Sequence, residues 1–233
     1  MISKSVFEHI ITEGIPDLWK ILLPEQKRIV SENLELQQFK KSQIIYSEGE
    51  DPEYLWILLN GKVKKYKSGI GDRVQILRLY RPVQYFGHRA YFAREAYGST
   101  AAAFESSTLG SLKMHLVEDL IRQNNELAMF IINNLSKTLG GSDTKIVSLT
   151  QKHIRGRLAE SLLLLADNYG LEDDRATIKI YMSREDLANL SNMTTANAIR
   201  TLSTFVNEHL IIVDGRKIKI LNEPQLRRIS KYG

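Results

Sequence analysis

Hydrophobic and polar positions follow three different patterns along the chain. From about Pro16 to Leu34, apolar side chains recur at helical spacing, which predicts a helix. From about Phe39 to Leu112, short runs rich in Ile, Val, Leu, Tyr and Trp alternate with glycines. Glycine supplies the positive φ angles of tight turns, so we expect about seven or eight strands in an antiparallel barrel or sandwich. Asn60-Gly61 between two apolar runs predicts a hairpin.

From about Val117 the pattern becomes helical again, and no proline interrupts it as far as Gly170. Five positions within it recur at spacings of three and four, typical of a coiled-coil seam: Leu135, Leu139, Ser142, Ile146 and Leu149. A small barrel cannot cover so long a helix on all sides, so we expect it to pair with a second copy of the chain. The alternative is a long core helix packed on its own barrel. Gly140-Gly141 weakens this helix by about 1 kcal/mol per glycine relative to alanine, and marks a flexible or a closely packed point.

The last third of the chain, from about His153, has the pattern of a small separate domain. A helix is predicted to end at Gly170, and "ATIKIY" (176–181) predicts a short strand. Ser183 and Thr194 are suited to cap two short helices that a tight turn separates. Asp214-Gly215 then predicts a hairpin. Helix, turn, helix and hairpin in this order are the layout of a winged helix-turn-helix, and the alternative is a three-helix packing unit with solvated polar residues outside.

The second short helix combines an apolar side with polar side chains that suit DNA. Its apolar spacing comes from Ala198, Ile199, Leu202 and Phe205. Hydroxyl, amide and guanidinium groups serve major-groove reading and phosphate anchoring, and Arg200 can bind guanine through two parallel hydrogen bonds. The candidate DNA-binding residues from this pattern are Thr194, Thr195, Asn197 and Arg200, with Lys217 in the predicted hairpin for phosphate.

Composition excludes several other classes of protein. The chain has no cysteine, which rules out disulfides, zinc–thiolate sites and cysteine-ligated iron–sulfur clusters. Its net charge of +5 weakly favours a polyanionic partner, although an ordinary basic protein has the same balance. No apolar run approaches the ~20 residues of a membrane helix and no export signal is visible, so we expect a cytoplasmic protein without membrane contact. Phosphate-binding loops and hydrolase motifs are also missing, so we expect no enzyme.

The order of these parts resembles the cAMP receptor/FNR (Crp/Fnr) family of bacterial transcription regulators. Three stretches carry the resemblance: "IIYSEGEDPEYLWILLNGKVKKYK" (44–67), "KHIRGRLAESLLLLA" (152–166) and "MSREDLANLSNMTTANAIRTL" (182–202). Each is weak alone, whereas the three in this order are specific to the family and cover nearly the whole chain.

The resemblance implies an α+β fold in three parts. These are an N-terminal antiparallel β-roll or jelly-roll barrel of the cyclic-nucleotide-binding type (1–116), a long connecting and dimerisation helix (117–150) and a C-terminal winged helix-turn-helix (151–233). It further implies a homodimer on an inverted repeat of double-stranded DNA, with recognition helices about 34 Å apart. The barrel would sense a small effector, and an activator would also contact RNA polymerase.

The resemblance also assigns DNA contacts residue by residue. Ser183 and Arg184 match the positions that touch phosphate at the start of the first short helix. Thr194, Thr195 and Arg200 match the positions on the second helix that contact bases or phosphate. The glutamate that is frequent in the family's recognition helix falls at Ala196. The family's usual base preference at that position is therefore in doubt for this chain.

The effector pocket departs from the cAMP-binding members. In those members the glutamate of "FGE" holds the ribose hydroxyl, and a later "RS" supplies the arginine that holds the phosphate. Here His88 follows Gly87, and Gly98 stands at the arginine position. A cyclic phosphate then lacks its charge-assisted partner unless Arg89 or Arg94 supplies one, so we expect an effector other than cAMP. The candidate pocket residues are Gly87, His88, Arg89, Gly98, Ser99, Thr100, Ser142 and Asp143.

Other effectors and functions stay open at this point. The oxygen-sensing iron–sulfur branch of the family needs cysteines, which the chain lacks. Haem ligation by His88 is an alternative, although a lone histidine is more often a surface or hydrogen-bonded residue. His9, His115, His153 and His209 show no metal-binding spacing. A second function to weigh is a cyclic-nucleotide-like binding module with a degenerate DNA domain that acts through protein contacts.

Overall fold

The computed structural model describes residue 12 and residues 16–232, in two compact units. The described residues through Ser68, with Leu77–Leu139, form the first unit, and Gly69–Ile76 with the chain from Gly140 forms the second. The functional division at 1–116, 117–150 and 151–233 stays a prediction.

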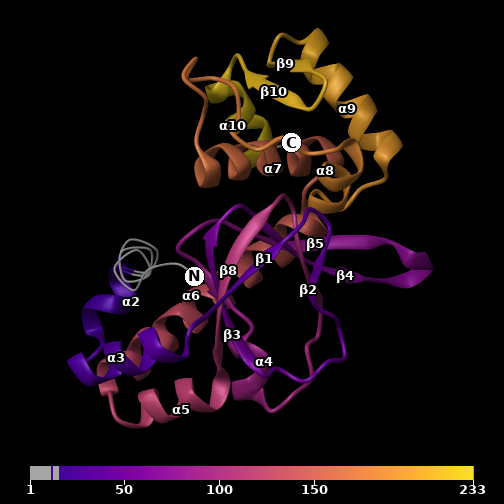
Figure 1. Ribbon diagram of the computed structural model, residues 1–233. Coiled ribbons are helices and arrows are strands. Elements are labelled where there is room, and N and C mark those ends of the chain that lie inside the picture. Colours follow the sequence, from indigo (N-terminus) through magenta and orange to yellow (C-terminus); the bar gives the residue numbers. More distant parts are fainter. Residues whose placement is uncertain (1–11, 13–15, 233) are drawn as a thin grey trace. The chain divides into compact units, whose positions relative to one another are not determined.

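In the described part of the chain, eight strands form two four-stranded sheets with the orders β1-β8-β3-β6 and β2-β7-β4-β5 (Figure 1). Their antiparallel arrangement confirms the predicted β-roll or jelly-roll fold. The strands are β1 (Glu35–Phe39), β2 (Ile44–Tyr46), β3 (Tyr54–Asn60), β4 (Val63–Ser68), β5 (Val74–Tyr80), β6 (Tyr85–Phe86), β7 (Thr100–Ala103) and β8 (Ser107–Lys113). The short 3₁₀ turn η1 (Ile70–Asp72) joins β4 to β5.

Strand β3 is buried on both of its faces, which explains why "LWIL" reads as a continuous apolar run. Trp56 and Leu58 face the aromatic core between the sheets. Leu55 and Ile57 point the other way, into a second core that helices cover. A strand buried on both faces loses the polar alternation that marks a half-buried strand.

Helices α2 (Pro16–Ile21), α3 (Pro24–Asn33) and α5 (Met114–Arg122) cover the outer face of this sheet (Figure 1). We predicted one helix where the structure has α2 and α3. The break follows from Pro24, which occupies the first turn of α3 and disfavours helical geometry at Leu23. Leu23 is accordingly extended, with φ −65° and ψ 156°.

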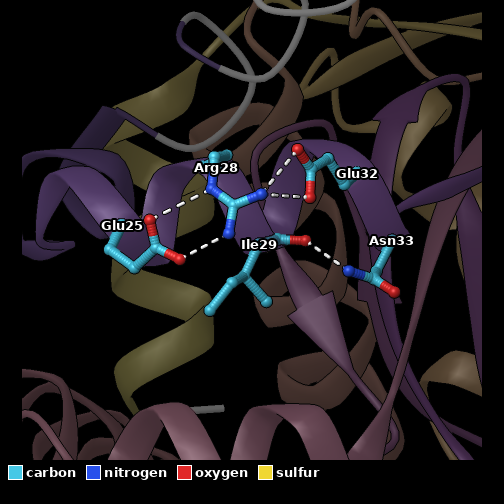
Figure 2. A network of polar contacts seen from close by, with 5 residues as sticks. All are labelled: Glu25, Arg28, Ile29, Glu32 and Asn33. Atoms are coloured by element: carbon cyan, nitrogen blue, oxygen red, sulfur yellow. Dashed lines mark hydrogen bonds and ion pairs between the residues drawn. The ribbon is translucent and has the colours of Figure 1, made fainter.

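Figure 2 shows a polar network on α3, centred on Arg28. The guanidinium bridges Glu25 and Glu32, one turn before and after it, and donates to Glu32 Oε2 at 2.9 Å. The Asn33 side chain donates to Ile29 O at 2.8 Å, close to the end of the helix. These side chains are exposed, so water screens each ion pair and its contribution to stability is small.

The hairpin predicted at Asn60-Gly61 is wrong. A turn does occur there, with φ +88° at Gly61, but β3 and β4 belong to different sheets. The dipeptide sets the local turn geometry. The pairing of the strands depends on contacts distant in sequence, since β3 pairs with β8 and β4 pairs with β7. A Cβ on Gly61 would lie 2.4 Å from Ser107 Oγ, so the close approach to Ser107 requires glycine.

The helical region from Val117 is divided into α5 and α6 (Asn125–Gln151) rather than forming one helix. Asn124 causes the break because its side chain forms three hydrogen bonds, including one that Nδ2 donates to Gln26 Oε1 at 2.8 Å. Its Oδ1 accepts a hydrogen bond from Leu127 N at 3.2 Å, which caps α6, and its Nδ2 donates to Ile21 O at 2.9 Å.

The second unit contains α7 (Ile154–Tyr169), α8 (Arg184–Leu190), α9 (Thr195–Asn207), β9 (Ile211–Asp214), β10 (Lys217–Ile220) and α10 (Glu223–Tyr232). The predicted C-cap at Gly170 is confirmed, with φ +77°. The predicted strand at 176–181 is wrong, because only isolated bridges link Ile178 to Leu171 and Thr177 to Lys219. Leu226 and Ile229 are the buried residues of α10, which lies beside α7 (Figure 1). None of the described helices has the length and apolar character needed to span a membrane.

We expect Gly61→Ala to lower the free energy of unfolding of the first unit by about 3 kcal/mol, because left-handed strain adds to the clash with Ser107. Gly49→Ala is the matched control, since its φ is +90° but no atom lies within 4 Å of its Cβ position. That control should lose about 1 kcal/mol from strain alone. Urea unfolding followed by tryptophan fluorescence reports this unit, which holds both tryptophans, Trp19 and Trp56. Equal losses in the two variants would contradict the close approach.

Candidate DNA-binding unit and effector pocket

Side-chain caps fix the starts of α8 and α9, as the sequence predicted. Ser183 Oγ accepts a hydrogen bond from Asp186 N at 3.0 Å and donates to Asp186 Oδ2 at 2.7 Å. Thr194 Oγ1 accepts from Asn197 N at 3.2 Å. Each cap satisfies a backbone donor that the first turn of a helix leaves free, so both helices begin at defined residues.

The turn between the two helices is held by Arg157 of α7, a residue that the sequence pattern did not single out. Its guanidinium donates to Ser191 O at 3.1 Å, to Asn192 O at 3.0 Å and to Lys152 O at 2.9 Å. Ser191 is 1% exposed and its hydroxyl also donates to Ser161 on α7. No local sequence signal distinguishes Arg157 from a solvated arginine, because its partners are backbone carbonyls, two of them distant along the chain.

The outward side of α9 carries the polar residues that the sequence singled out. Thr195 and Arg200 are exposed and Asn197 is half-buried. Among the described residues, the Arg200 guanidinium has no acidic partner, which leaves its donors available. One expectation is wrong: Ile199 does not join the inward apolar face but is 48% exposed. The roles of these residues toward DNA stay predictions.

Arg184 joins the start of α8 to the tip of the wing, the β9–β10 hairpin that forms at Asp214-Gly215 as predicted. Its Nη2 donates to Gly215 O at 2.8 Å, and its Nη1 is buried without a partner. Lys217 extends over the ring of Tyr181, with Nζ 5.7 Å from the ring centroid. Lys217 and Arg184 therefore lie on the same side of the unit as the wing turn.

Gly87 opens α4 (His88–Ala93) at a position that only glycine fits. Its φ is +99°, and a Cβ there would lie 2.7 Å from Tyr54 O. The glycine therefore lets α4 start directly against β3. This geometry places the next residue, His88, inside the barrel unit.

His88 is 9% exposed, and its Nδ1 has no hydrogen-bond partner. The ring lies 5.2 Å from that of Tyr85, whose hydroxyl is also buried and unpartnered. Burial, with the positive charges of Lys65 and Arg78, lowers the pKa of His88 to about 4, so the imidazole is neutral at neutral pH. The histidine is thus neither a surface residue nor hydrogen-bonded through Nδ1. Two neighbouring side chains between the sheet and the helices that cover it therefore each have a buried polar atom with unused hydrogen-bonding capacity.

The remaining barrel candidates gather around Gly98. The Nη2 of Arg89 lies 3.7 Å from the Cβ position of Gly98, so its guanidinium lies beside the residue that replaces the family's arginine. Arg89 also pairs with Glu95 at 3.1 Å. Lys67 Nζ donates to Gly98 O at 3.1 Å. Ser99 is buried, and Thr100 Oγ1 accepts from Glu48 N at 3.1 Å.

Arg94 has no atom within 4 Å of the Cβ position of Gly98. It ends α4 in the left-handed region, with φ +57°, and lines a separate cavity of about 830 Å³ between α4 and the start of α5. Lys113, His115 and Glu118 belong to the same lining. Of the two arginines proposed to replace the missing one, the structure brings only Arg89 to Gly98.

Helix α6 carries the predicted seam, and several of its apolar side chains are uncovered. Leu139 is 65% exposed and Ile146 is 60% exposed, while Leu135 and Leu149 are half-buried. Ser142 and Asp143 are exposed positions of the same helix within the second unit. The predicted seam did not include Ile132, one heptad before Leu139, which is 52% exposed and extends the seam toward the N-terminus of α6.

The histidines do not belong to a metal-binding cluster in the part of the chain that the structure describes. Over those residues, no group of three or more His, Asp or Glu side chains could hold a metal ion. His9 lies outside the described residues.

Comparison with known proteins assigns a domain to each half of the chain. A family model for the cyclic nucleotide-binding domain matches residues 36–124, and one for the Crp-like helix-turn-helix domain matches residues 156–229. Families with this helix-turn-helix bind DNA and usually act as dimers.

Relatives and solved structures agree with these matches. A CRP-like cAMP-activated global transcriptional regulator of Mycobacterium tuberculosis is 22% identical over 209 residues, which cover 89% of this chain and 93% of the relative. A global nitrogen regulator of Synechococcus elongatus is 25% identical and covers 81% of this chain and 86% of its own. The structure of FixK2 from Bradyrhizobium japonicum has the same fold, with a TM-score of 0.76 and 22% identity over 84% of this chain and 96% of that one.

Two matched domains in this order, with relatives that are transcription regulators rather than enzymes, show that the chain belongs to the Crp/Fnr family of bacterial transcription regulators.

Proposed function

We propose that this regulator is a homodimer that reads an inverted repeat in double-stranded DNA, and that its barrel senses a small effector which repositions the helix-turn-helix. The observation that carries the proposal is the outward side of α9. Arg200 is exposed there without an acidic partner among the described residues, beside Thr195, and the wing adds Arg216 and Lys217. A regulator of this kind acts in the bacterial cytoplasm, where the DNA lies, and contacts RNA polymerase when it activates.

DNA reading divides between base and phosphate contacts. Arg200 can donate two hydrogen bonds to the O6 and N7 atoms of guanine when α9 enters the major groove. Asn197 is half-buried and reaches a base only from the edge of the helix, so Thr195 and Arg200 are the principal readers. Ser183, Arg184, Thr194 and Lys217 lie at the start of α8, the start of α9 and the wing, which suits phosphate and fixes the register of α9.

The homodimer is supported by the exposed stripe on α6. Ile132, Leu139 and Ile146 are spaced by sevens and are each more than half exposed. Apolar side chains at this spacing gain about 25 cal/mol per Å² when a partner helix covers them. Pairing of two α6 helices, with Leu135, Ser142 and Leu149 in the same seam, gives a two-fold dimer that matches an inverted repeat.

The effector site is supported by buried polar atoms that lack partners. Tyr85 Oη and His88 Nδ1 belong to neighbouring side chains on the helix-covered side of the sheet, close to the positive charges of Lys65 and Arg78. Arg89 and Lys67 lie beside Gly98, where they pair with Glu95 and Glu48, and an anionic ligand would take the place of these carboxylates. These groups favour a small anionic effector. Cyclic AMP is not expected, because His88 stands where cAMP-binding members place the glutamate that holds the ribose.

The effector would act by a shift between two populations of the dimer. A ligand that binds one state more tightly than the other raises the share of that state by its difference in affinity. Within the pocket we assign Gly87 and His88 to the start of α4, and Arg89, Gly98, Ser99 and Thr100 to the anion-binding side. Ser142 and Asp143 on α6 are proposed as the contacts that transmit binding to the dimer helix.

The proposed function is tested by in vitro selection of duplex DNA with the purified full chain, first alone and then with cell extract. Enrichment of an inverted repeat is expected in at least the second selection. Failure to enrich any sequence in either one would favour the alternative, a binding module whose DNA domain no longer reads sequence.

We expect Arg200→Ala to weaken binding to the selected site by about 1–3 kcal/mol, because it removes a base contact. Arg228→Ala on α10 is the matched control, since Arg228 is also exposed and forms no ion pair within the described part of the chain. Fluorescence anisotropy at one fixed salt concentration measures both affinities. The assigned role of Arg200 fails if the two variants bind equally well.

We expect Leu139→Glu to convert the dimer to a monomer, because it places a charge in the middle of the seam. Leu221→Glu, at another apolar residue that is 46% exposed, should leave the mass unchanged. Light scattering measures the mass of each variant. A dimer that survives Leu139→Glu would show that α6 does not form the interface.

We expect His88 to make the first unit less stable in mild acid. Its pKa of about 4 in the folded chain lies below the usual value of 6.5, so protonation favours the unfolded chain. The contribution of neutral His88 to the free energy of unfolding is therefore fully present above about pH 6.5. It is lost as the pH falls toward about 4. Between about pH 7.5 and about pH 5, wild type should lose about 2 kcal/mol more than His88→Gln in urea unfolding.

His115→Gln is the control for this measurement, because His115 belongs to the same unit and is exposed. It should retain the full pH dependence of the wild type. A His88→Gln variant that retains it as well would contradict the buried, neutral state of His88.

A further inference from the structure

Two apolar side chains lie on the outward side of α9, between its candidate DNA-reading residues. Ala196 is exposed and Ile199 is 48% exposed. Thr195 precedes the first of them and Arg200 follows the second. An apolar pair therefore lies in the middle of a surface that is otherwise polar and basic.

The helix cannot turn this pair inward. Ala198, Leu202 and Phe205 are exposed by 0%, 3% and 0%, so they fix which side of α9 faces the core. At about 3.6 residues per turn, positions 196, 199, 200 and 203 share the opposite side. Ser203, the next residue on that side, donates its hydroxyl to Ile199 O at 3.1 Å. The Ser203 hydroxyl proton is therefore used within the helix, and Ala196 and Ile199 are the apolar members of this side.

We propose that Ala196 and Ile199 read thymine, by contact with its C5-methyl group next to the guanine that Arg200 binds. This inference rests on the proposed role of α9 as the recognition helix. The thymine methyl is the apolar feature that base pairs present in the major groove, and apolar side chains recognise it by contact. A glutamate at position 196 would accept a hydrogen bond from the amino group of cytosine, but Ala196 has no acceptor. This chain would instead contact the methyl group of thymine at that position.

The surroundings of the pair favour DNA over a protein partner. Arg200, directly after Ile199, is exposed and has no acidic partner in the described part of the chain. Arg216 and Lys217 on the wing are exposed as well. A polyanion neutralises this charge while the bases cover the apolar pair. Val206 lies two turns beyond Ile199 and is 37% exposed, so it serves as a control on the same helix.

The test uses the full chain and the inverted repeat found by selection. Each thymine of the half-site is replaced in turn by deoxyuridine, which removes only the methyl group. Loss of one buried methyl should weaken binding about fourfold, and loss of both symmetric methyls about fifteenfold. Ile199→Ala should weaken binding to the thymine site and reduce this discrimination at one position. Val206→Ala should keep both the affinity and the discrimination.

Several results would overturn the inference. If the wild type binds its selected site equally well with uracil at every position, the methyl reading is wrong while the proposed function stands. If selection yields no specific site, the proposed function itself fails, and the inference with it. A full thymine preference in Ile199→Ala would remove Ile199 from the reading. A changed mass of free Ile199→Ala in light scattering would assign this surface to contact between copies instead.

Discussion

The geometry of the DNA-binding unit depends on how the tight turn between α8 and α9, in which Ser191 and Met193 are buried, satisfies its backbone carbonyls. Backbone polar groups that are removed from water need partners, and the turn from Ser191 to Thr194 cannot provide them by itself. Arg157 supplies them from α7, with hydrogen bonds to Ser191 O and Asn192 O. The caps at Ser183 and Thr194 then fix where each helix begins. These contacts set the direction in which α9 leaves the turn. They therefore decide which side of α9 faces outward.

The candidate effector site in the barrel unit contains buried polar groups that lack hydrogen-bond partners. Buried polar groups are nearly always hydrogen-bonded, so each exception calls for an explanation. Tyr85 Oη and His88 Nδ1 are two such exceptions in one place. Burial lowers the pKa of His88 to about 4, so this group stays neutral rather than forming an ion pair. A ligand that forms hydrogen bonds with these groups would complete the site, and the nearby positive charges of Lys65 and Arg78 are the basis of the proposed anionic effector.

Features that depend on neighbouring residues could be predicted from the sequence, and those that depend on distant contacts could not. The caps at Ser183 and Thr194 and the end of α7 at Gly170 were correct because each involves residues within one turn. The hairpin at Asn60-Gly61 was wrong because its turn is local but the pairing of β3 with β8 is not. Ile199 was grouped with the apolar spacing of Ala198, Leu202 and Phe205, and only the packing of the unit shows that it is exposed while those three are buried.

The glycine pair Gly140-Gly141 in α6 bears on how the proposed effector site could influence the DNA-binding unit. Gly140-Gly141 falls where the two compact units divide, within one helix that carries the exposed seam. Apart from the adjacent residues and the helix's own backbone, no described atom lies within 4 Å of a Cβ built at either glycine, so close packing within the chain does not require them. Of the two interpretations, a flexible point or a closely packed one, the single chain therefore favours the first. The pair lowers helix stability by about 1 kcal/mol per glycine relative to alanine, so straight and bent arrangements of the helix would differ less in free energy than with alanine at these positions. An effector with a modest difference in affinity for those arrangements can then shift the proposed dimer toward the state that reads DNA.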